Sequence, residues 1–267
     1  MRFLSRVLGM ATDAATTPGE TESIDAAMER ARLAFDAKDY ATALAIWVEL
    51  AERGVTRAQS NLAGLYSYGW GVPRDDAVAA GWFRRAADAG DPIAQQNLAL
   101  MYYEGRGTDG DLAEAARWYK RAAEGGQAEA QNMLSWMCLE GVGVERDYAA
   151  ARRWAEAAAA QGNASAQCRI GQIHHNAWGV ERNPAEAARW FQLAAEQGDS
   201  EAQTMLGAAY HLGLGVAQDQ AQAFRWLTCA AGHGSDLAAG FLRRVDAIIT
   251  SEERSAAQRL LGAGNRS

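Results

Sequence analysis

The sequence has few prolines, lysines and cysteines, and each shortage excludes a class of protein. Four prolines and a charged fraction of 22% exclude collagen-like and disordered chains. Only two of the 26 basic residues are lysines, Lys38 and Lys120, and the arginines are interspersed with acids, which predicts that no basic patch forms. The formal net charge of −7 argues against nucleic acids and anionic membranes as partners.

Cysteine is equally scarce. The chain has three, Cys138, Cys168 and Cys229, and an odd number without a short recurring spacing is not a disulfide framework. No Cys-x-x-Cys pair or matching histidine is present, so we expect no metal centre, and nothing indicates a cofactor. Each cysteine lies in an apolar stretch, which predicts reduced core cysteines in a reducing compartment and hence a cytoplasmic protein.

Long hydrophobic runs are also missing. The longest stretch without a charge covers residues 202–218 and contains three glycines together with Gln, Thr and His, so no transmembrane segment is expected. Alanine, in contrast, is abundant, with 59 residues. Because alanine favours helices and is depleted in strands, this composition predicts closely packed helices.

A 36-residue period is the dominant pattern of the sequence. A tryptophan, a glycine, a glutamine and a pair of alanines each recur at this step, the tryptophans being Trp82, Trp118, Trp154, Trp190 and Trp226. Tandem units therefore run over residues 55–90, 91–126, 127–162, 163–198 and 199–234. One unit cannot bury its apolar face alone, whereas stacked neighbours can, which predicts a helical solenoid.

Each unit predicts two helices. In the first unit, Ala58, Leu62 and Tyr66 form an apolar stripe at helical spacing, and Gly69 offers the left-handed conformation that ends a helix. The second helix carries the tryptophan and begins after an N-cap, which in the five units is Asp75, Asp111, Asp147, Asn183 and Asp219. Gln127 replaces the polar cap of one first helix, so we expect that helix start to fray.

The segments outside the repeats differ from them. Residues 23–54 resemble one tetratricopeptide-like hairpin without the central loop. Residues 235–267 are interpreted as capping helices, the last one opened by a capping box of Thr250 and Glu253. Residues 1–22 contain two arginines within a short apolar stretch and are interpreted as a flexible leader or a short docking helix, with a cleaved export signal as the alternative.

The repeated pattern A-Q-x-x-L-(A/G)-x-x-Y-x-x-G-x-G-V-x-x-D-x-x-x-A-x-x-W-x-x-x-A-A-x-x-G resembles the Sel-one-like repeat, a branch of the tetratricopeptide-like superfamily. Residues 58–90 fit it at every fixed position. The resemblance implies an all-α, right-handed α/α solenoid of helical hairpins whose first helices line the concave face. It also implies an adaptor or scaffold, the main role of this family, in bacteria often in signalling or envelope processes. Ala177 and Thr108 depart from the pattern in the loops, and Ala177 bears on the turn geometry of its unit.

Motifs that could carry chemistry are chance matches. Residues 105–110 spell G-x-G-x-x-G, but this segment joins two helices instead of following a strand, so it is not a dinucleotide loop. No serine has a lysine three residues later and no G-x-S-x-G occurs, so no nucleophile can be nominated. His175 and His211 share a register, but two imidazoles without a third ligand make a poor metal site.

A second stripe on the first helices is the candidate binding surface. Positions 60, 64, 67 and 68 of the first unit are displaced by about 200° from the packing stripe and, on the geometry that the resemblance implies, face the concave groove. The stripe carries aromatic and aliphatic anchors bordered by carboxylates, as interfaces do. The candidate contact residues are Tyr68, Leu100, Tyr103, Glu104, Trp136, Leu139, Glu140, His175, Asn176 and His211. The alternative is that Trp136 and Leu139 tuck against neighbouring helices, and Trp70 is interpreted as loop packing.

These observations predict a non-enzymatic adaptor that binds another protein or a peptide segment along the concave face. Five units at about 10 Å each give a groove near 50 Å long, enough for about 15 extended residues. The acids favour a basic segment. Two alternatives stay open: an envelope-associated or exported protein, and a small-ligand hydrolase of the β-lactamase type, as claimed for cysteine-rich relatives. The sequence does not indicate the partner's identity or the oligomeric state.

Overall fold

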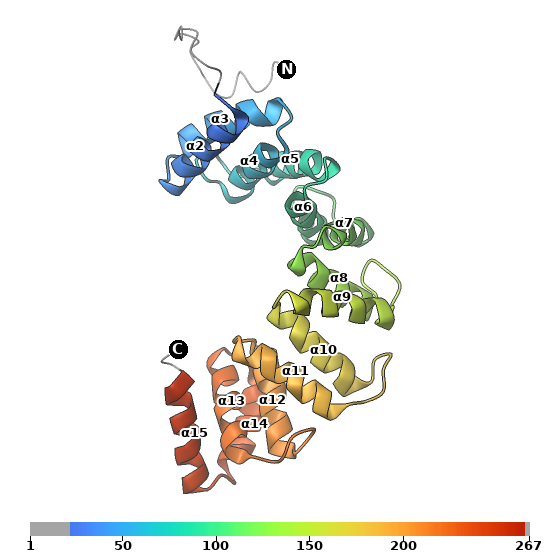
Figure 1. The fold of residues 1–267 in the computed structure, drawn as a ribbon, viewed down its shortest axis with the longest axis vertical. Coiled ribbons are helices and arrows are strands. Elements are labelled where there is room, and N and C mark those ends of the chain that lie inside the picture. Colours follow the sequence, from blue (N-terminus) through green and yellow to red (C-terminus); the bar gives the residue numbers. More distant parts are fainter. Residues whose placement is uncertain (1–21, 265–267) are drawn as a thin grey trace.

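A computed structural model describes residues 22–264, which form fourteen helices and no strand. The helices are α2 (Ile24–Asp36), α3 (Tyr40–Glu52), α4 (Thr56–Tyr68), α5 (Asp76–Asp88), α6 (Pro92–Glu104), α7 (Leu112–Glu124), α8 (Ala128–Glu140), α9 (Tyr148–Ala160), α10 (Ala164–Asn176), α11 (Pro184–Glu196), α12 (Ser200–Leu212), α13 (Gln220–Gly232), α14 (Asp236–Asp246) and α15 (Ser251–Gly264). They stack as hairpins along an open arc (Figure 1), which confirms the predicted all-α solenoid. Apart from Glu22, the predicted leader lies outside the described residues.

Local capping explains why the helices begin where they do. Each of the five predicted N-caps of the second helices accepts a hydrogen bond from a backbone N–H in the first turn, as Asp147 does from Ala150. Gln127 makes no such side-chain bond, as expected. The first helix of the fourth unit ends at Ala177 with φ 59° and ψ 38°, close to the φ 73° and ψ 37° of Gly141 in the unit before. The turn therefore keeps its shape, although a left-handed alanine costs about 1–2 kcal/mol.

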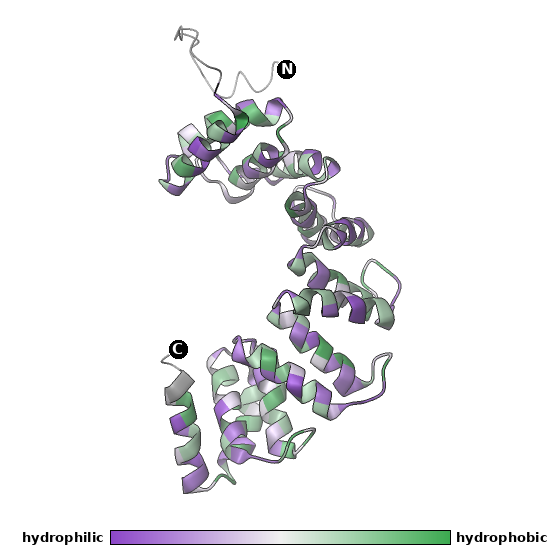
Figure 2. Ribbon diagram, viewed as in Figure 1, coloured by the Kyte–Doolittle hydropathy of each residue, from purple (hydrophilic) through white to green (hydrophobic). Residues whose placement is uncertain are grey.

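The core follows the repeated apolar positions. Trp82, Trp118 and Trp226 are 8%, 3% and 5% exposed, whereas Trp154 and Trp190 are half-buried. Leucine or isoleucine at the first-helix position, such as Leu98, is at most 3% exposed in every repeat. Figure 2 shows hydrophilic and hydrophobic residues mixed along the helices, as expected when one stripe of each helix is buried. Each fully buried large side chain stabilises the fold by about 1.5–3 kcal/mol.

Two contacts between successive repeats explain constant residues whose role the sequence alone does not reveal. The side-chain amide of Gln95 donates to the carbonyl of Ala87 at 3.1 Å, and the same bond recurs from Gln59, Gln131 and Gln203. The loop glycine Gly143 lies so close to the preceding second helix that a Cβ there would meet the carbonyl oxygen of Leu112 at 2.1 Å. The glutamine therefore holds four of the five repeats against the preceding hairpin, and the loop glycine allows the close approach.

The C-terminal helices close the stack. α14 packs against α13 and α12, and α15 turns back to pack against α13. The predicted capping box is confirmed: the backbone N–H and the hydroxyl of Thr250 both donate to the Glu253 carboxylate at 2.8 Å. Within residues 22–264, the helices are too short or too polar to cross a membrane.

Candidate functional site

The first helices of the repeats, α4, α6, α8, α10 and α12, form one row of the solenoid. α10 contacts both α8 and α12, and α12 contacts α14, in addition to the contacts within each hairpin. In a curved stack, elements that touch across repeats lie on the inner side of the curve. These contacts place the row on the inner side of the curve, where the candidate residues were expected.

Tyr103 and Trp136 join two adjacent first helices in the middle of the row. Their ring centroids are 6.0 Å apart at an interplanar angle of 81°, an edge-to-face arrangement that stabilises aromatic pairs. Both side chains are half-buried, with one part packed against the core, as is Leu100. Trp136 was interpreted either as a contact residue or as packed against neighbouring helices. The structure shows features of both, because the ring packs on Tyr103 and still reaches solvent.

Leu139 does not belong to this surface. It is 3% exposed and lies within the core, so it cannot contact a partner, and the prediction that placed it there is wrong. Its register is also that of Tyr103, His175 and His211, which are half-buried, and of Ser67, which is buried. At this register the side chains of Ser67 and Leu139 are therefore buried, whereas the rings of Tyr103, His175 and His211 still reach solvent in part.

Carboxylates border the central aromatic pair. Glu104 forms an ion pair with Arg106 at 2.8 Å, and its side chain is 40% exposed. Glu140 is exposed and forms no ion pair within 4 Å among the described residues. We call Leu100, Tyr103, Glu104, Trp136 and Glu140 the central patch. It combines a rigid aromatic anchor with one free negative charge, as protein interfaces often do.

The remaining candidates lie farther along the row. His211 shares a hydrogen bond of 2.9 Å between its Nδ1 and the Gln220 side chain, and its ring lies 6.3 Å from Phe241. His175 is half-buried, and burial, with Arg182 nearby, lowers its pKa. Asn176 is exposed. A mostly apolar cavity of about 150 Å³ lies beside these helices, lined by His175, Phe191, Met205, Leu212 and Phe241 among others.

The two histidines show no metal-site geometry. Within residues 22–264, no three His, Cys, Asp or Glu side chains are grouped so that they could hold a metal ion. Cys168 is 2% exposed, and burial strongly raises the pKa of its thiol. It therefore stays protonated at neutral pH and is a poor nucleophile.

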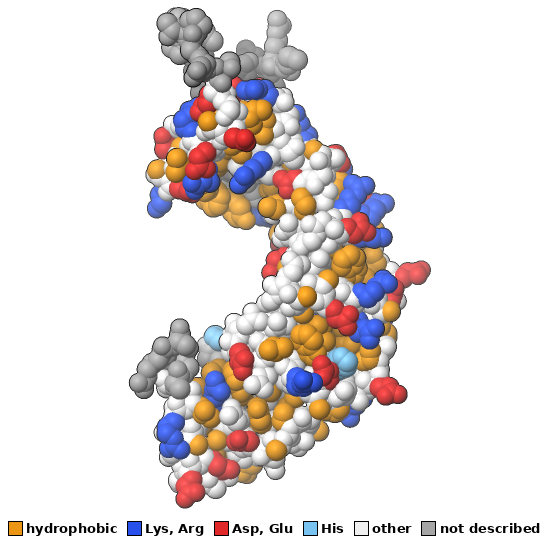
Figure 3. All heavy atoms as spheres, in the orientation of Figure 1, with side chains coloured by type: hydrophobic (Ala, Val, Ile, Leu, Met, Phe, Trp, Pro, Cys, Tyr) orange, Lys and Arg blue, Asp and Glu red, His pale blue; other side chains and the backbone are white. Residues whose placement is uncertain are grey.

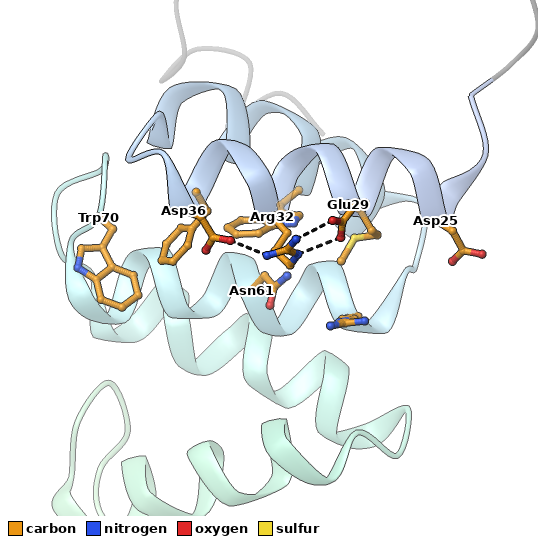
Figure 4. A pocket seen from close by; sticks show the side chains of 10 residues that line it. Asp25, Glu29, Arg32, Asp36, Asn61 and Trp70 are labelled. Atoms are coloured by element: carbon orange, nitrogen blue, oxygen red, sulfur yellow. Dashed lines mark hydrogen bonds and ion pairs between the residues drawn. The ribbon is translucent and has the colours of Figure 1, made fainter.

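A pocket at the other end of the row was missed by sequence reasoning. It has a volume of about 520 Å³ and lies between α2 and α4 (Figure 4). Trp70, interpreted above as loop packing, lines it and is 39% exposed. Its ring stacks on Tyr68 with centroids 4.6 Å apart, and Phe35 packs edge-on at 5.1 Å. Tyr68, a predicted contact residue, is 64% exposed.

The charges of this pocket are mostly paired with one another. Arg32 donates two hydrogen bonds to Glu29, at 2.9 and 2.6 Å, and one to Asp36 at 2.5 Å (Figure 4). The hydrogen bonds from Arg32 lower the pKa of Glu29. The indole N–H of Trp47, another lining residue, is buried without a hydrogen-bond partner. Outside these ion pairs, the pocket is lined by the aromatic residues Phe35, Trp47 and Trp70 and by Asp25, Met28, Arg57 and Asn61. The one signal for it in the sequence is the density of aromatic residues between positions 35 and 70.

A basic patch lies on the second helices, against the expectation that none forms. Arg84 and Arg121 lie 5.8 and 4.5 Å from the ring of Trp118, and Arg85 lies 4.3 Å from Trp82. Lys120 occupies the register of Arg84, and Arg121 that of Arg85. The repeat brings such equivalents onto successive helices, so charges separated by 36 residues gather although acids intervene in the sequence.

Comparisons with known proteins agree with this architecture. The model of the Sel1 repeat family matches residues 56–91, 92–127, 128–163, 164–199 and 200–235, the same 36-residue step read from the sequence, starting one residue later. No curated protein gives a significant match.

Two solved structures are similar over most of the chain. One is c5321, a protective antigen of uropathogenic Escherichia coli strains with an SLR fold, which is 34% identical with a TM-score of 0.80 over 91% of this chain. The match spans 55% of that protein, so the chain corresponds to about half of its length. The other is a Sel1 repeat protein from Oxalobacter formigenes, 31% identical with a TM-score of 0.74, covering 78% of this chain and 86% of that one.

Proposed function

Because the chain belongs to the Sel1 repeat family, whose members are generally protein-interaction scaffolds without enzymatic activity, we propose that it is an adaptor that binds a segment of another protein along the row of first helices. The observation that carries the proposal is the pair of half-buried rings of Tyr103 and Trp136. The pair bridges two repeats, and the carboxylates of Glu104 and Glu140 follow it on the same two helices. Aromatic anchors of this kind supply most of the affinity at protein interfaces.

The partner segment is basic on this proposal. Among the described residues, Glu140 forms no ion pair within 4 Å, and Glu104 pairs only with Arg106, whose side chain is 32% exposed. Exposed ion pairs contribute little stability and exchange readily, so a partner's lysine or arginine can replace Arg106 at small cost. Binding should therefore weaken as salt rises, because the charges are screened within about 8–10 Å at physiological ionic strength.

The test places a photo-reactive phenylalanine analogue at position 103 and, as a matched control, at Leu193, which is 47% exposed on the second helix α11. We expect a crosslinked protein at position 103 and none at position 193. Trp136→Ala in the same chain should reduce the crosslink at least five-fold while circular dichroism stays unchanged. Equal crosslinking at both positions, or a yield unaffected by Trp136→Ala, would refute the inner row as the binding surface.

The compartment is a separate proposal. All three cysteines are free, and Cys138 and Cys168 are buried, which supports a reducing compartment such as the cytoplasm. The similarity to a protective antigen supports the alternative, in which the chain is exported. Intact-mass analysis of the protein from its native cells distinguishes the two, because loss of about the first 20 residues would mean export.

A further inference from the structure

A cleft of about 470 Å³ opens between α5, α6 and the loop before α7, away from the inner row. Its apolar lining includes Ala77, Ala80 and Leu98, and its polar lining includes Arg84, Thr108, Asp109 and Asp111. The cleft shares no lining residue with the pocket at Trp70 or with the central patch.

The cleft exists because three residues depart from the repeat at one place. Gly81 stands where the other four repeats carry arginine, namely Arg117, Arg153, Arg189 and Arg225. Thr108 stands where the others carry valine, and Gly110 where they carry arginine or glutamine. All three line the cleft, and two of them are glycines that place no side chain in it. A Cβ added at Gly81 would meet nothing within 4 Å.

A cation without a counter-ion borders the same cleft. The Arg84 guanidinium contacts the Tyr102 hydroxyl and lies 5.4 Å from the Tyr102 ring and 5.8 Å from that of Trp118. Within residues 22–264, no carboxylate lies within 4 Å of Arg84, or of its neighbours Arg85 and Arg121. Arg117, in contrast, is paired with Glu114. Basic side chains gather over α5 and α7 at the right-hand edge of Figure 3.

We propose that this cleft binds the carboxylate side chain of an aspartate or glutamate from a protein partner, with Arg84 as its counter-ion. An arginine held on aromatic rings presents a preorganised fork, which matches a carboxylate. Asp109 and Asp111, which also line the cleft, and the net charge of −7 limit the site to a single carboxylate and disfavour a dense polyanion such as a nucleic acid. The site is distinct from the inner row, which attracts a basic segment, so two segments of opposite charge can be held at once.

The test is a titration of the full chain with N-acetyl-glutamic acid methylamide, followed by the NMR signals of the Arg84 side-chain N–H and the backbone amides of Thr108 and Gly110. The matched probe is N-acetyl-glutamine methylamide, which has the same shape without the charge. We expect saturable shifts with the glutamate probe and at least ten-fold weaker binding of the glutamine probe.

Two variants at one position separate the cleft from general charge attraction. Gly81→Leu fills the cleft without adding a charge and should abolish the shifts, whereas Gly81→Ala leaves the cleft open and should preserve them. Arg84→Gln should abolish them as well. The proposal fails if both probes bind equally, if Gly81→Leu binds as the unmodified chain does, or if inorganic phosphate produces the larger saturable shift at the same signals.

Discussion

The tryptophan ladder gives the most direct test of the packing argument. Trp118 is 3% exposed, donates from its indole N–H to Glu114 at 2.9 Å, and lies beneath the Arg121 guanidinium at 4.5 Å. Truncating a core tryptophan to alanine costs about 3–5 kcal/mol through lost burial and the cavity left behind. The hydrogen bond accounts for about 1 kcal/mol of this, because the Glu114 carboxylate keeps its ion pair with Arg117 after the indole is removed. We therefore expect Trp118→Ala to lower the free energy of unfolding by about 4 kcal/mol.

Urea unfolding followed by circular dichroism measures this loss, and the repeat provides its own control. Trp154 occupies the same register on α9 but is only half-buried, so Trp154→Ala should cost about half as much. A loss below about 1 kcal/mol for Trp118→Ala would mean that the tryptophan is not a core residue. If Trp154→Ala lowered the free energy of unfolding more than Trp118→Ala, the buried fraction of each tryptophan would not predict its contribution to stability.

Three further substitutions test the turns and the locks between repeats by the same unfolding assay. Ala177→Gly should stabilise the chain by about 0.5–1 kcal/mol, since glycine removes the left-handed strain but loses more entropy on folding; a destabilised variant would contradict this. Gly143→Ala should cost about 3 kcal/mol, because the new Cβ would clash with the Leu112 carbonyl, and a neutral result would show that the loop moves freely. Gln95→Ala should lower the free energy of unfolding by about 1–2 kcal/mol, because the hydrogen bond to the Ala87 carbonyl is lost. An unchanged urea midpoint would show that this bond does not stabilise the contact between repeats.

The fold was predictable because the same physical requirements recur in every unit. Asp75 and its equivalents sit before helices whose first N–H groups need an acceptor, and the structure places a hydrogen bond at each. Leu98 and its equivalents lie at the spacing that one helix face requires, and they are buried. The missing side-chain cap of α8 was also predictable, because Gln127 stands at its N-cap and an amide one carbon longer than that of asparagine is a poor cap.

The candidate site was predictable only in part. Position along the helix placed Tyr103 and Trp136 on the inner row, but it also placed Leu139 there, although that side chain is buried. Register gives the direction in which a side chain leaves its helix and does not say how far the next repeat covers it. The same limit hid the pocket at Trp70, whose walls come from three consecutive helices and the loop after them.

Periodicity alone therefore determined the all-α solenoid, because capping, turn geometry and apolar spacing are local requirements that each unit repeats. The tertiary structure decided which of the repeated positions stay open. The cleft beside Gly81 requires departures in two different units to meet across a packing interface, and the charges around Trp118 gather only when second helices stack. Such surfaces depend on distances between helices, and no spacing within a single helix encodes them.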